Sequence, residues 1–418
     1  MDGNAVWDVI VIGGGPAGMM AAGKAAENGA KVILIEKNDT LGKKLLLTGG
    51  GRCNFTNSEL DPRKFIEKYK DSGKFLFSAF SKWGVKETLE FFHERGIKTR
   101  VEEGLRVFPE SDSAKTVLDA LIGYMKESGV DILLNSQVTN LSCEEKVFTG
   151  VKLKNGNLIK GRSAIITTGG TSWPETGSTG DGYSWLRDVG HTISEPSPLL
   201  VPISIKDSWV KELAGTSLKN INISAFQNDK KIISVRGDIL FTHTGVSGPA
   251  IINMSGDIGK MLKNGDVVIS LDLFPEKDHG LLNSILQELF KKHDKKKLRN
   301  ALSDIIPSAV ISLVMNISGV ETEVECNSVT KEDRMAIIGV LKNIPMRVDG
   351  LFDADRSIVA SGGVISEEVD FRTMRSRLVP NLYLAGDILD IDRPSGGYSL
   401  QLCWTTGRIA GDSSFGAY

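Results

Sequence analysis

The sequence predicts an α/β fold, in which helices flank a parallel sheet and further segments are inserted into the sheet domain. Three observations predict it. Residues Trp7–Ile12 read as a buried strand, nearly all Val and Ile, that runs directly into a glycine-rich turn and an apolar helix. Residues Lys31–Ile35 read as a second apolar strand. Near the end of the chain, the strand Leu382–Ala385 again opens into glycines and a helix, so both ends are expected to build one domain.

Length and composition limit the classes of protein to consider. A chain of 418 residues is longer than a single hydrophobic core supports, so two or three domains are expected. The net charge of −2 predicts no nucleic-acid partner and no anionic membrane partner. The N-terminus lacks the basic region of a signal peptide, no apolar run reaches the roughly 18 residues of a membrane span, and the four cysteines lack metal-ligand spacing. We therefore expect a cytoplasmic protein without a metal site.

The first turn has the spacing of a dinucleotide-binding motif. Gly13, Gly15 and Gly18 form G-x-G-x-x-G directly after the first strand. The first glycine permits the tight turn, the second lets a pyrophosphate approach the backbone, and the third lets the helix pack closely on the strand. Glu36 ends the second strand, where an acid binds a ribose hydroxyl and disfavours a 2′-phosphate. These features predict a Rossmann-like domain that binds a dinucleotide.

A second glycine-rich loop, GKKLLLTGGGRCN, covers residues 42–54. Its three consecutive glycines can present backbone amides to an anion, and Lys44 and Arg52 add positive charge beside them. We predict that this loop contacts the same cofactor; a solvated basic turn is the alternative. Cys53 has no second cysteine nearby to resolve a disulfide, which argues against a redox role.

The middle of the chain reads as helices followed by a meander of strands. Helices are predicted within Phe65–Gly96 and over Ser113–Ser128. The strands that follow return the chain to the carboxyl edge of the sheet at Thr167–Gly170, where ligands of such folds bind. These strands are Val130–Leu134, Gln137–Ser142, Val147–Lys154 and Ser163–Thr167.

Two regions beyond this meander offer candidates for substrate contact. The loop Thr171–Trp185 carries Tyr183 and two tryptophans, which either line a substrate site or are buried in the core. His243 lies in a Gly/Ser-rich turn within the β-rich stretch Leu199–Phe274, where it contacts substrate or serves turn chemistry. The stretch Glu276–Ile344 is helical, and its basic run KKHDKKKLR has acidic neighbours and no aromatic residues, which favours a solvated helix face over RNA binding.

The C-terminal region indicates which dinucleotide is bound. Asp387 follows the strand Leu382–Ala385 and is placed to bind the ribityl hydroxyls of a flavin. The helix that begins near Gly397 would direct its positive end at an anion or at a reduced isoalloxazine. A second G-x-G-x-x-G, roughly 150 residues further on, is absent, so an integral NAD(P)H domain is not expected. We therefore predict FAD, with NAD(P)H as a possible transient electron donor.

A series of blocks resembles one family. GGGPAGMMAA, GKKLLLTGGGRCN, RVFPESDSA, TGSTGDGY, FTHTGVSGPA, ASGGV and GGYSLQ occur in this order in the aminoacetone-oxidase-like and bile-acid-reductase-like family of FAD-binding oxidoreductases. The resemblance spans nearly the whole chain. It implies a discontinuous FAD/NAD(P)-binding domain of glutathione-reductase type over residues 1–190 and 350–418, a β-rich inserted domain over 191–275 and 344–349, and a small helical domain over 276–343.

The resemblance also implies the cofactor-binding positions, with two departures. The family has Glu where Asp387 stands and Asn where Ser399 stands, which affects fine flavin contacts. With the immediate neighbours of these motifs included, the predicted cofactor-binding residues are Gly13, Gly15, Pro16, Ala17, Gly18, Glu36, Lys37, Lys44, Thr48, Gly51, Arg52, Cys53, Asn54, Val138, Thr168, Gly169, Gly386, Asp387, Gly396, Gly397 and Tyr398. The predicted substrate-side residues are Tyr183, His243 and Tyr398.

The predicted function is that of a FAD-dependent oxidoreductase, a nucleotide-binding flavoprotein that transfers a hydride between a small organic substrate and flavin while the inserted domains close over the site. Two versions stay open: an oxidase, or an NAD(P)H-fed reductase of a conjugated, steroid-like carbonyl compound. A flavin-dependent RNA-modifying protein is a second alternative, and a flavin-binding sensor a third. No side chain is predicted to act as a catalytic nucleophile, acid or base, and no oligomeric state is predicted.

Overall fold

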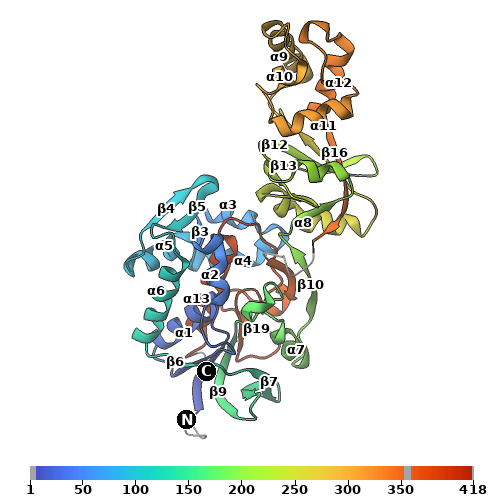
Figure 1. Cartoon of the computed structure of the whole chain (residues 1–418). Helices are drawn as coiled ribbons and strands as arrows, with labels where there is room; N and C mark the ends of the chain where they lie inside the picture. Colours follow the sequence, from blue (N-terminus) through green and yellow to red (C-terminus); the bar gives the residue numbers. More distant parts are fainter. Residues whose placement is uncertain (1–5, 353–358, 417–418) are drawn as a thin grey trace. The chain divides into compact units, whose positions relative to one another are not determined.

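The computed structural model describes residues 6–352 and 359–416, which divide into two compact units (Figure 1). Unit 1 comprises Met1–Ser197 and Ile358–Tyr418, and unit 2 comprises Pro198–Ser357. Each unit has its own hydrophobic core. Residues 191–197, assigned above to the insert, lie in unit 1, where β10 (Ile193–Leu199) pairs with β17 (Val359–Val364). Residues 350–352 lie in unit 2, because β16 (Ile344–Leu351) continues a barrel there.

Unit 1 is built on a nine-stranded sheet with the order β18–β19–β20–β9–β1–β2–β6, and β7 and β8 extend it from β9. The central strands β20, β9, β1, β2 and β6 are parallel, which confirms the predicted α/β fold. The strands are β1 (Val6–Ile12), β2 (Val32–Ile35), β6 (Asp131–Leu133), β7 (Val138–Glu144), β8 (Val147–Leu153), β9 (Leu158–Ile166), β18 (Val369–Asp370), β19 (Arg375–Ser376) and β20 (Leu382–Leu384).

Strand β20 brings the C-terminal segment into the same sheet as the N-terminal strand. Leu382, Tyr383 and Leu384 pair with Ala164, Ile165 and Ile166 of β9, which itself pairs with β1. The following helix, α13 (Tyr398–Ser413), lies beside α1 (Pro16–Glu27) (Figure 1). The prediction that the two ends of the chain build one domain is therefore correct.

The remaining helices of unit 1 cover the sheet and carry a small second sheet of order β3–β5–β4. The helices predicted within residues 65–96 are present as the end of α3, α4 and α5, and Gly84 lies between α4 and α5 as the N-cap of α5. The helices are α2 (Lys43–Leu47), α3 (Pro62–Glu67), α4 (Gly73–Lys82), α5 (Val85–Glu94), α6 (Ala114–Glu127) and α7 (Asp181–Asp188), and the strands are β3 (Thr56–Asn57), β4 (Thr99–Glu102) and β5 (Arg106–Pro109).

Unit 2 combines a closed barrel, of order β11–β14–β13–β12–β15–β16, with a group of helices. Its elements are β11 (Ile203–Ile205), β12 (Ser217–Gln227), β13 (Lys230–Phe241), β14 (Gly245–Ser247), α8 (Pro249–Leu262), β15 (Val268–Asp272), α9 (His279–Lys292), α10 (Leu298–Leu302), α11 (Ser308–Ser318), α12 (Lys331–Lys342) and β16. Barrel and helices share one continuous core, and Lys342 of α12 pairs with Asp272 of β15 at 2.7 Å.

None of the helices within residues 6–352 and 359–416 combines the length and the apolar character that crossing a bilayer requires.

Candidate cofactor-binding site

The three glycines of the first turn have different surroundings. A Cβ built on Gly13 would stand 2.5 Å from the carbonyl oxygen of Thr167, and one built on Gly18 would stand 1.9 Å from the carbonyl oxygen of Gly13. A Cβ on Gly15 would meet nothing within 4 Å. Gly13 and Gly18 are thus required by the packing of the turn itself, whereas the bare face of Gly15 opens into space that a ligand can use.

A large pocket lies along this turn, and we call it the main pocket. Its empty volume is about 930 Å³. Gly15, Pro16 and Ala17 line it at the N-terminus of α1, which no side chain caps. The first N–H groups of α1 are therefore available to an anion. Of the predicted cofactor residues, the main pocket is lined by Gly13, Gly15, Pro16, Ala17, Glu36, Lys44, Thr48, Thr168, Gly169, Gly386 and Asp387.

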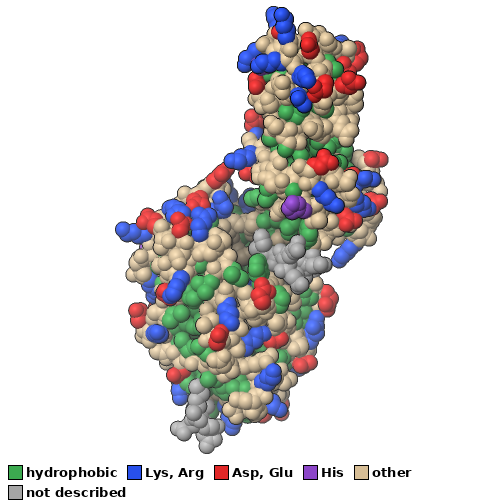
Figure 2. Space-filling model, in the orientation of Figure 1, with side chains coloured by type: hydrophobic (Ala, Val, Ile, Leu, Met, Phe, Trp, Pro, Cys, Tyr) green, Lys and Arg blue, Asp and Glu red, His purple; other side chains and the backbone are tan. Residues whose placement is uncertain are grey.

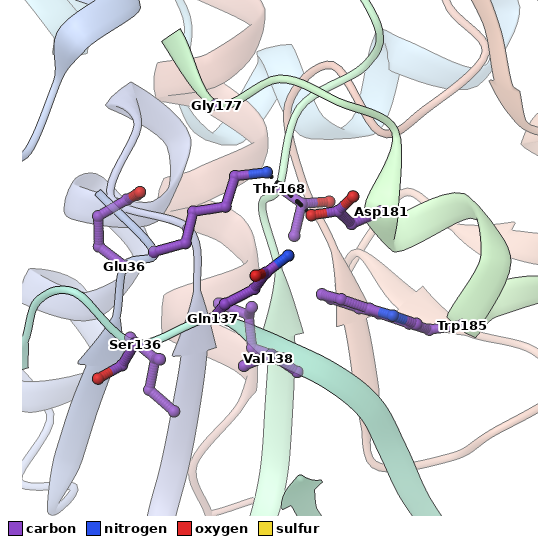
Figure 3. A pocket seen from close by; sticks show the side chains of 12 residues that line it. Glu36, Ser136, Gln137, Val138, Thr168, Gly177, Asp181 and Trp185 are labelled. Carbon is purple, nitrogen blue, oxygen red and sulfur yellow. Dashed lines mark hydrogen bonds and ion pairs between the residues drawn. The ribbon is translucent and has the colours of Figure 1, made fainter. Parts of the chain in front are cut away.

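A smaller pocket of about 390 Å³, the side pocket, shares Gly13, Glu36, Thr168 and Gly177 with the main pocket. Figure 3 shows Glu36 and Trp185 on opposite sides of it, with Gln137 between them. Together the two pockets form an extended space along the carboxyl ends of the parallel strands, which suits an elongated ligand. Lys37 and Val138, both predicted cofactor residues, also line the side pocket.

Glu36 is held at the end of β2 by two backbone groups. Its Oε2 accepts a hydrogen bond from the N–H of Gly14 at 2.6 Å, and its Oε1 accepts one from the N–H of Asn38 at 2.8 Å. The carboxylate therefore braces the glycine turn. Each oxygen retains a further lone pair toward the pockets that Glu36 lines, so the ribose contact predicted for it is compatible with this arrangement.

Two residues that line the side pocket, Lys37 and Asp181, form an ion pair. The Nζ of Lys37 lies 2.9 Å from Oδ2 of Asp181 and donates to Oγ1 of Thr179 at 2.6 Å. Burial raises the pKa of Asp181, but the hydrogen bonds from Lys37 and Thr179 outweigh it and lower the pKa overall. Asp181 is therefore charged at neutral pH and holds Lys37 over the pocket.

Asp387, which follows β20, lies in a cluster of charges on the wall of the main pocket. Its Oδ2 lies 3.2 Å from Nζ of Lys44, which also donates to Oγ of Ser172 at 2.6 Å. Its Oδ1 accepts a hydrogen bond from the guanidinium of Arg393. Burial raises the pKa of Asp387, but the charges of Arg393 and Lys44 more than offset this and lower it. The carboxylate is therefore ionised within a polar wall.

Thr168, at the end of β9, carries a buried hydroxyl that finds no hydrogen-bond partner in the described part of the chain. The residue lines both pockets. A buried hydroxyl without a partner is unfavourable, and a ligand in these pockets would satisfy it. The open face of Gly15, the uncapped α1 and the Thr168 hydroxyl thus fit a bound dinucleotide.

Eight of the predicted cofactor residues do not line either pocket. Gly18 serves helix packing, as described above. In the GGG loop, Gly49, Gly50 and Gly51 are exposed and have positive φ angles. Arg52 pairs with Glu102 at 2.9 Å and stacks on the ring of Phe108. The eight residues are Gly18, Gly51, Arg52, Cys53, Asn54, Gly396, Gly397 and Tyr398.

Three further residues of this group, Cys53, Asn54 and Gly397, lie at or near the N-terminal end of α13. With its amide nitrogen directed at the carbonyl of Thr56 and its oxygen at the N–H of Gly397, the orientation that satisfies both groups, Asn54 bridges them at 3.1 Å each. A Cβ on Gly397 would lie 2.2 Å from the carbonyl oxygen of Thr56, so only glycine fits there. Cys53 is buried, and burial raises the pKa of its thiol to about 12. These residues position the helix that lines the main pocket with Ser399, Leu400 and Cys403.

Two of the predicted substrate-side residues, Tyr183 and Tyr398, belong to unit 1, and the third, His243, belongs to unit 2. Tyr183 is buried, and its hydroxyl approaches the backbone carbonyl of Asp387 at 3.4 Å. Tyr398 is buried against Phe65, with ring centroids 4.7 Å apart. His243 is exposed in unit 2. Of the two alternatives predicted for Tyr183, a substrate site or burial in the core, the structure has burial in the core. Neither tyrosine lines the pockets described here.

The prediction missed Arg393 and gave Trp185 no cofactor role. Arg393 lies in the DRPSGG loop between β20 and α13, where a charged residue beside two glycines was the available signal. Trp185 was singled out only as an aromatic residue that needed burial or a ligand. It is buried and lines the side pocket, so both descriptions apply.

This fold and this pocket define the class of protein: an oxidoreductase of the flavoprotein type, built on a dinucleotide-binding Rossmann domain. The chain belongs to the HI0933-like family, because the family model described as HI0933-like protein Rossmann domain matches residues 7–413. The family resemblance predicted from the sequence is therefore confirmed.

Curated relatives match over nearly the full length. The chain is 29% identical over 404 residues to a 3-dehydro-bile acid delta(4,6)-reductase of Clostridium scindens, covering 96% of this chain and 97% of the relative. It is 28% identical over 400 residues to a ribosomal RNA dihydrouridine synthase of Escherichia coli, covering 96% of each.

Solved structures share the fold at low sequence identity. A 3-ketosteroid-delta4-(5alpha)-dehydrogenase from Rhodococcus jostii aligns with a TM-score of 0.54 at 13% identity, covering 98% of this chain and 97% of that one. A flavocytochrome c3 fumarate reductase aligns with a TM-score of 0.53 at 16% identity, covering 98% and 78%. At these identities the similarity shows the fold alone.

Proposed function

We propose that the protein is a FAD-dependent oxidoreductase that reduces a carbon–carbon double bond conjugated to a carbonyl group in a small organic molecule. The observation that carries the proposal is the convergence of three features on one pocket: the open face of Gly15, the unpartnered hydroxyl of Thr168 and the ionised Asp387. They come from the ends of β1, β9 and β20, which are neighbours in the sheet.

The residues of the two pockets suit different parts of FAD. The N–H groups at the start of α1 suit the diphosphate, and Gly15 leaves room for it. Glu36, Val138 and Trp185 of the side pocket suit the adenosine half. Lys44 and Asp387 offer polar contacts to the ribityl chain. When bound, FAD supplies reversible acceptance of a hydride, a reaction that none of these side chains can perform.

The substrate class follows from what the two full-length relatives are named for. A delta(4,6)-reductase of a 3-dehydro-bile acid and a dihydrouridine synthase both act on a carbon–carbon double bond conjugated to a carbonyl group. This shared chemistry supports the reductase over the oxidase among the two versions that the sequence left open. Electrons are proposed to come from transient NADH or NADPH, since the sequence contains one G-x-G-x-x-G motif.

Anaerobic mixing of the purified holoprotein with NADH or NADPH, followed by a steroid enone, tests the proposal. We expect the flavin absorbance to bleach with the nicotinamide donor and to return when the enone is added, with formation of the saturated ketone. Reoxidation by dioxygen alone, with no response to any enone, would favour the oxidase. A colourless protein that takes up no FAD on reconstitution would remove the proposal altogether.

A second candidate is a flavin-dependent modifier of ribosomal RNA, which the relatives from Escherichia coli and Haemophilus influenzae favour. The net charge of −2 argues against a broad RNA-binding face. On the face in view in Figure 2, Lys and Arg lie interspersed with Asp and Glu. A gel-shift titration with ribosomal RNA that lacks dihydrouridine, at 50 and 200 mM salt, separates the candidates: tight, salt-sensitive binding supports the RNA substrate.

A cytoplasmic location is also proposed, in keeping with the chemistry of the cysteines. Cys53, Cys143, Cys326 and Cys403 are all free thiols. Free thiols of this kind are typical of a reducing compartment. Fractionation of the native cells with an antibody against the chain tests this location.

A further inference from the structure

Arg393 is a buried cation with three hydrogen-bond partners. The residue is 4% exposed. Its guanidinium donates to Oδ1 of Asp387, to Oγ of Ser399 at 3.1 Å and to the carbonyl oxygen of Ile391 at 2.7 Å. Burying a guanidinium is expensive unless it is paired and hydrogen-bonded, so the loop is arranged around this side chain.

Two of these partners belong to the main pocket. Asp387 and Ser399 both line it, one from the end of β20 and the other from the first turn of α13. Arg393 therefore ties the strand end to the helix start behind the pocket wall. It also fixes one carboxylate oxygen of Asp387, while Lys44 holds the other.

Two cations and one anion are in mutual contact on this wall, and two further acids, Asp390 and Asp392, lie in the same loop. Lys44 and Arg393 contribute two positive charges, and Asp387 contributes one negative charge. Asp390, in the same loop, accepts a hydrogen bond from the N–H of Gly362. Ser399 and Leu400 bring the N-terminal turn of α13 to the pocket, and no side chain caps that turn. Its helix dipole adds to the positive character of the wall.

We infer that Arg393 is a positioning residue of the proposed FAD site: it holds Asp387 and adds positive charge to this wall, which favours the reduced cofactor over the oxidised one. The inference rests on the proposed function. Uptake of a hydride adds two electrons and one proton to the isoalloxazine, so the bound molecule gains one negative charge. The diphosphate has the same charge in both states and cancels from the comparison. The positive charge of Arg393 therefore makes binding of the reduced form tighter than it would be without this charge.

The test is the midpoint potential of the bound flavin, measured by equilibration of the holoprotein with a redox dye of known potential. In Arg393→Gln we expect the affinity for reduced FAD to fall about tenfold relative to oxidised FAD, a decrease of about 30 mV for a two-electron couple. Arg393→Lys keeps the charge and is expected to restore most of the potential. Arg162→Gln removes an exposed cation from β9 and is the matched control, expected to leave the potential unchanged.

Asp387→Asn provides a measurement of opposite sign. Removing the negative charge leaves two cations on the wall, so the potential is expected to rise above that of the parent. If Arg393→Gln does not fold, the midpoint potential of Asp387→Asn tests the inference in its place. An unchanged potential in Arg393→Gln, or a fall in Asp387→Asn, would overturn the inference. A parent protein without FAD would instead overturn the proposed function, so the two failures are distinguishable.

Discussion

Gly407 of α13 lies so close to Ala17 of α1 that a Cβ built on it would stand 2.4 Å from the carbonyl oxygen of Ala17. One helical turn further on, Gly411 repeats this relationship with Ala21, at 2.3 Å from its carbonyl oxygen. Two glycines four residues apart thus form a flat strip on α13, against which the backbone of α1 packs directly. This contact fixes the two helices that begin at the main pocket.

Replacement of Gly407 by Ala is expected to destabilise unit 1 by about 1–3 kcal/mol, because the added methyl group overlaps backbone that cannot move away. Gly123, in the middle of α6, is the matched control, since a Cβ there meets nothing within 4 Å. Gly123→Ala is expected to be neutral or stabilising by up to about 1 kcal/mol. Urea unfolding of both variants measures the difference, and equal stabilities would contradict the close helix contact.

The different roles of Gly15 and Gly18 predict different defects. Gly15→Val is expected to fold with a melting temperature near that of the parent cofactor-free protein but to lose FAD, because its side chain fills the space left for the diphosphate. Gly18→Ala is expected to lower the stability of the cofactor-free protein itself, since its Cβ would overlap the carbonyl of Gly13. The ratio of flavin to protein absorbance, together with thermal unfolding, separates the two. A Gly15→Val protein as yellow as the parent would contradict the assignment.

His191 predicts a pH dependence of stability. It is buried, with Nδ1 2.8 Å from Oε2 of Glu368 and Nε2 2.9 Å from Oγ of Ser376. Burial lowers its pKa below the ordinary 6.5, although the hydrogen bond and charge of Glu368 oppose this. Below pH 6.5 the unfolded chain therefore binds more protons at this site than the folded chain, so the free energy of unfolding decreases as the pH falls.

The measurement compares urea unfolding at pH 7, 6 and 5 in the parent and in His191→Gln. In His191→Gln the free energy of unfolding is expected to depend less steeply on pH. The difference in slope is at most about 1.4 kcal/mol per pH unit, the limit for one titrating proton. His93→Gln, which changes an exposed histidine, is the control variant. Identical pH profiles for the parent and His191→Gln would show that His191 titrates normally in the folded protein.

Thiol labelling tests the structural role assigned to Cys53. Burial raises the pKa of Cys53 to about 12, so its thiol stays protonated at pH 8, and the side chain is buried. Cys326 and Cys403 are also buried, and burial raises the pKa of both thiols. Half-buried Cys143 is expected to react first with iodoacetamide in the folded protein. Peptide mass mapping identifies the site, and early labelling of Cys53 would contradict its burial.

Local spacing was sufficient to predict the turn and the ends of the central strands. Gly13, Gly15, Gly18 and Glu36 lie within one strand–helix–strand unit, so their geometry follows from short-range rules. Asp387 was also predicted, because it directly follows an apolar strand that ends in glycine. In each case the sequence neighbours alone determine on which edge of the sheet the residue lies.

Contacts between distant segments were not predictable in this way. Arg52 was expected at an anion site, but a carboxylate fifty residues later in the chain, that of Glu102, pairs with it. The β-rich character of the insert was predicted, whereas its closure as a barrel depends on β11 pairing with β16, about 140 residues away. The strip formed by Gly407 and Gly411 gave no signal because its partner is the other end of the chain.

The position of β20 beside β9 has a consequence for biosynthesis. On a translating ribosome, β9 emerges more than 200 residues before β20, which pairs with residues 164–166 on its second edge, whereas β8 already pairs with residues 158–160 on that edge. Throughout that interval the C-terminal half of this edge is unpaired, a surface on which another chain can add and start aggregation. Unit 2, whose residues are continuous in the chain, can complete its own core meanwhile. We therefore expect folding during synthesis to finish in the reverse of chain order, with the inserted unit first and the N-terminal domain last.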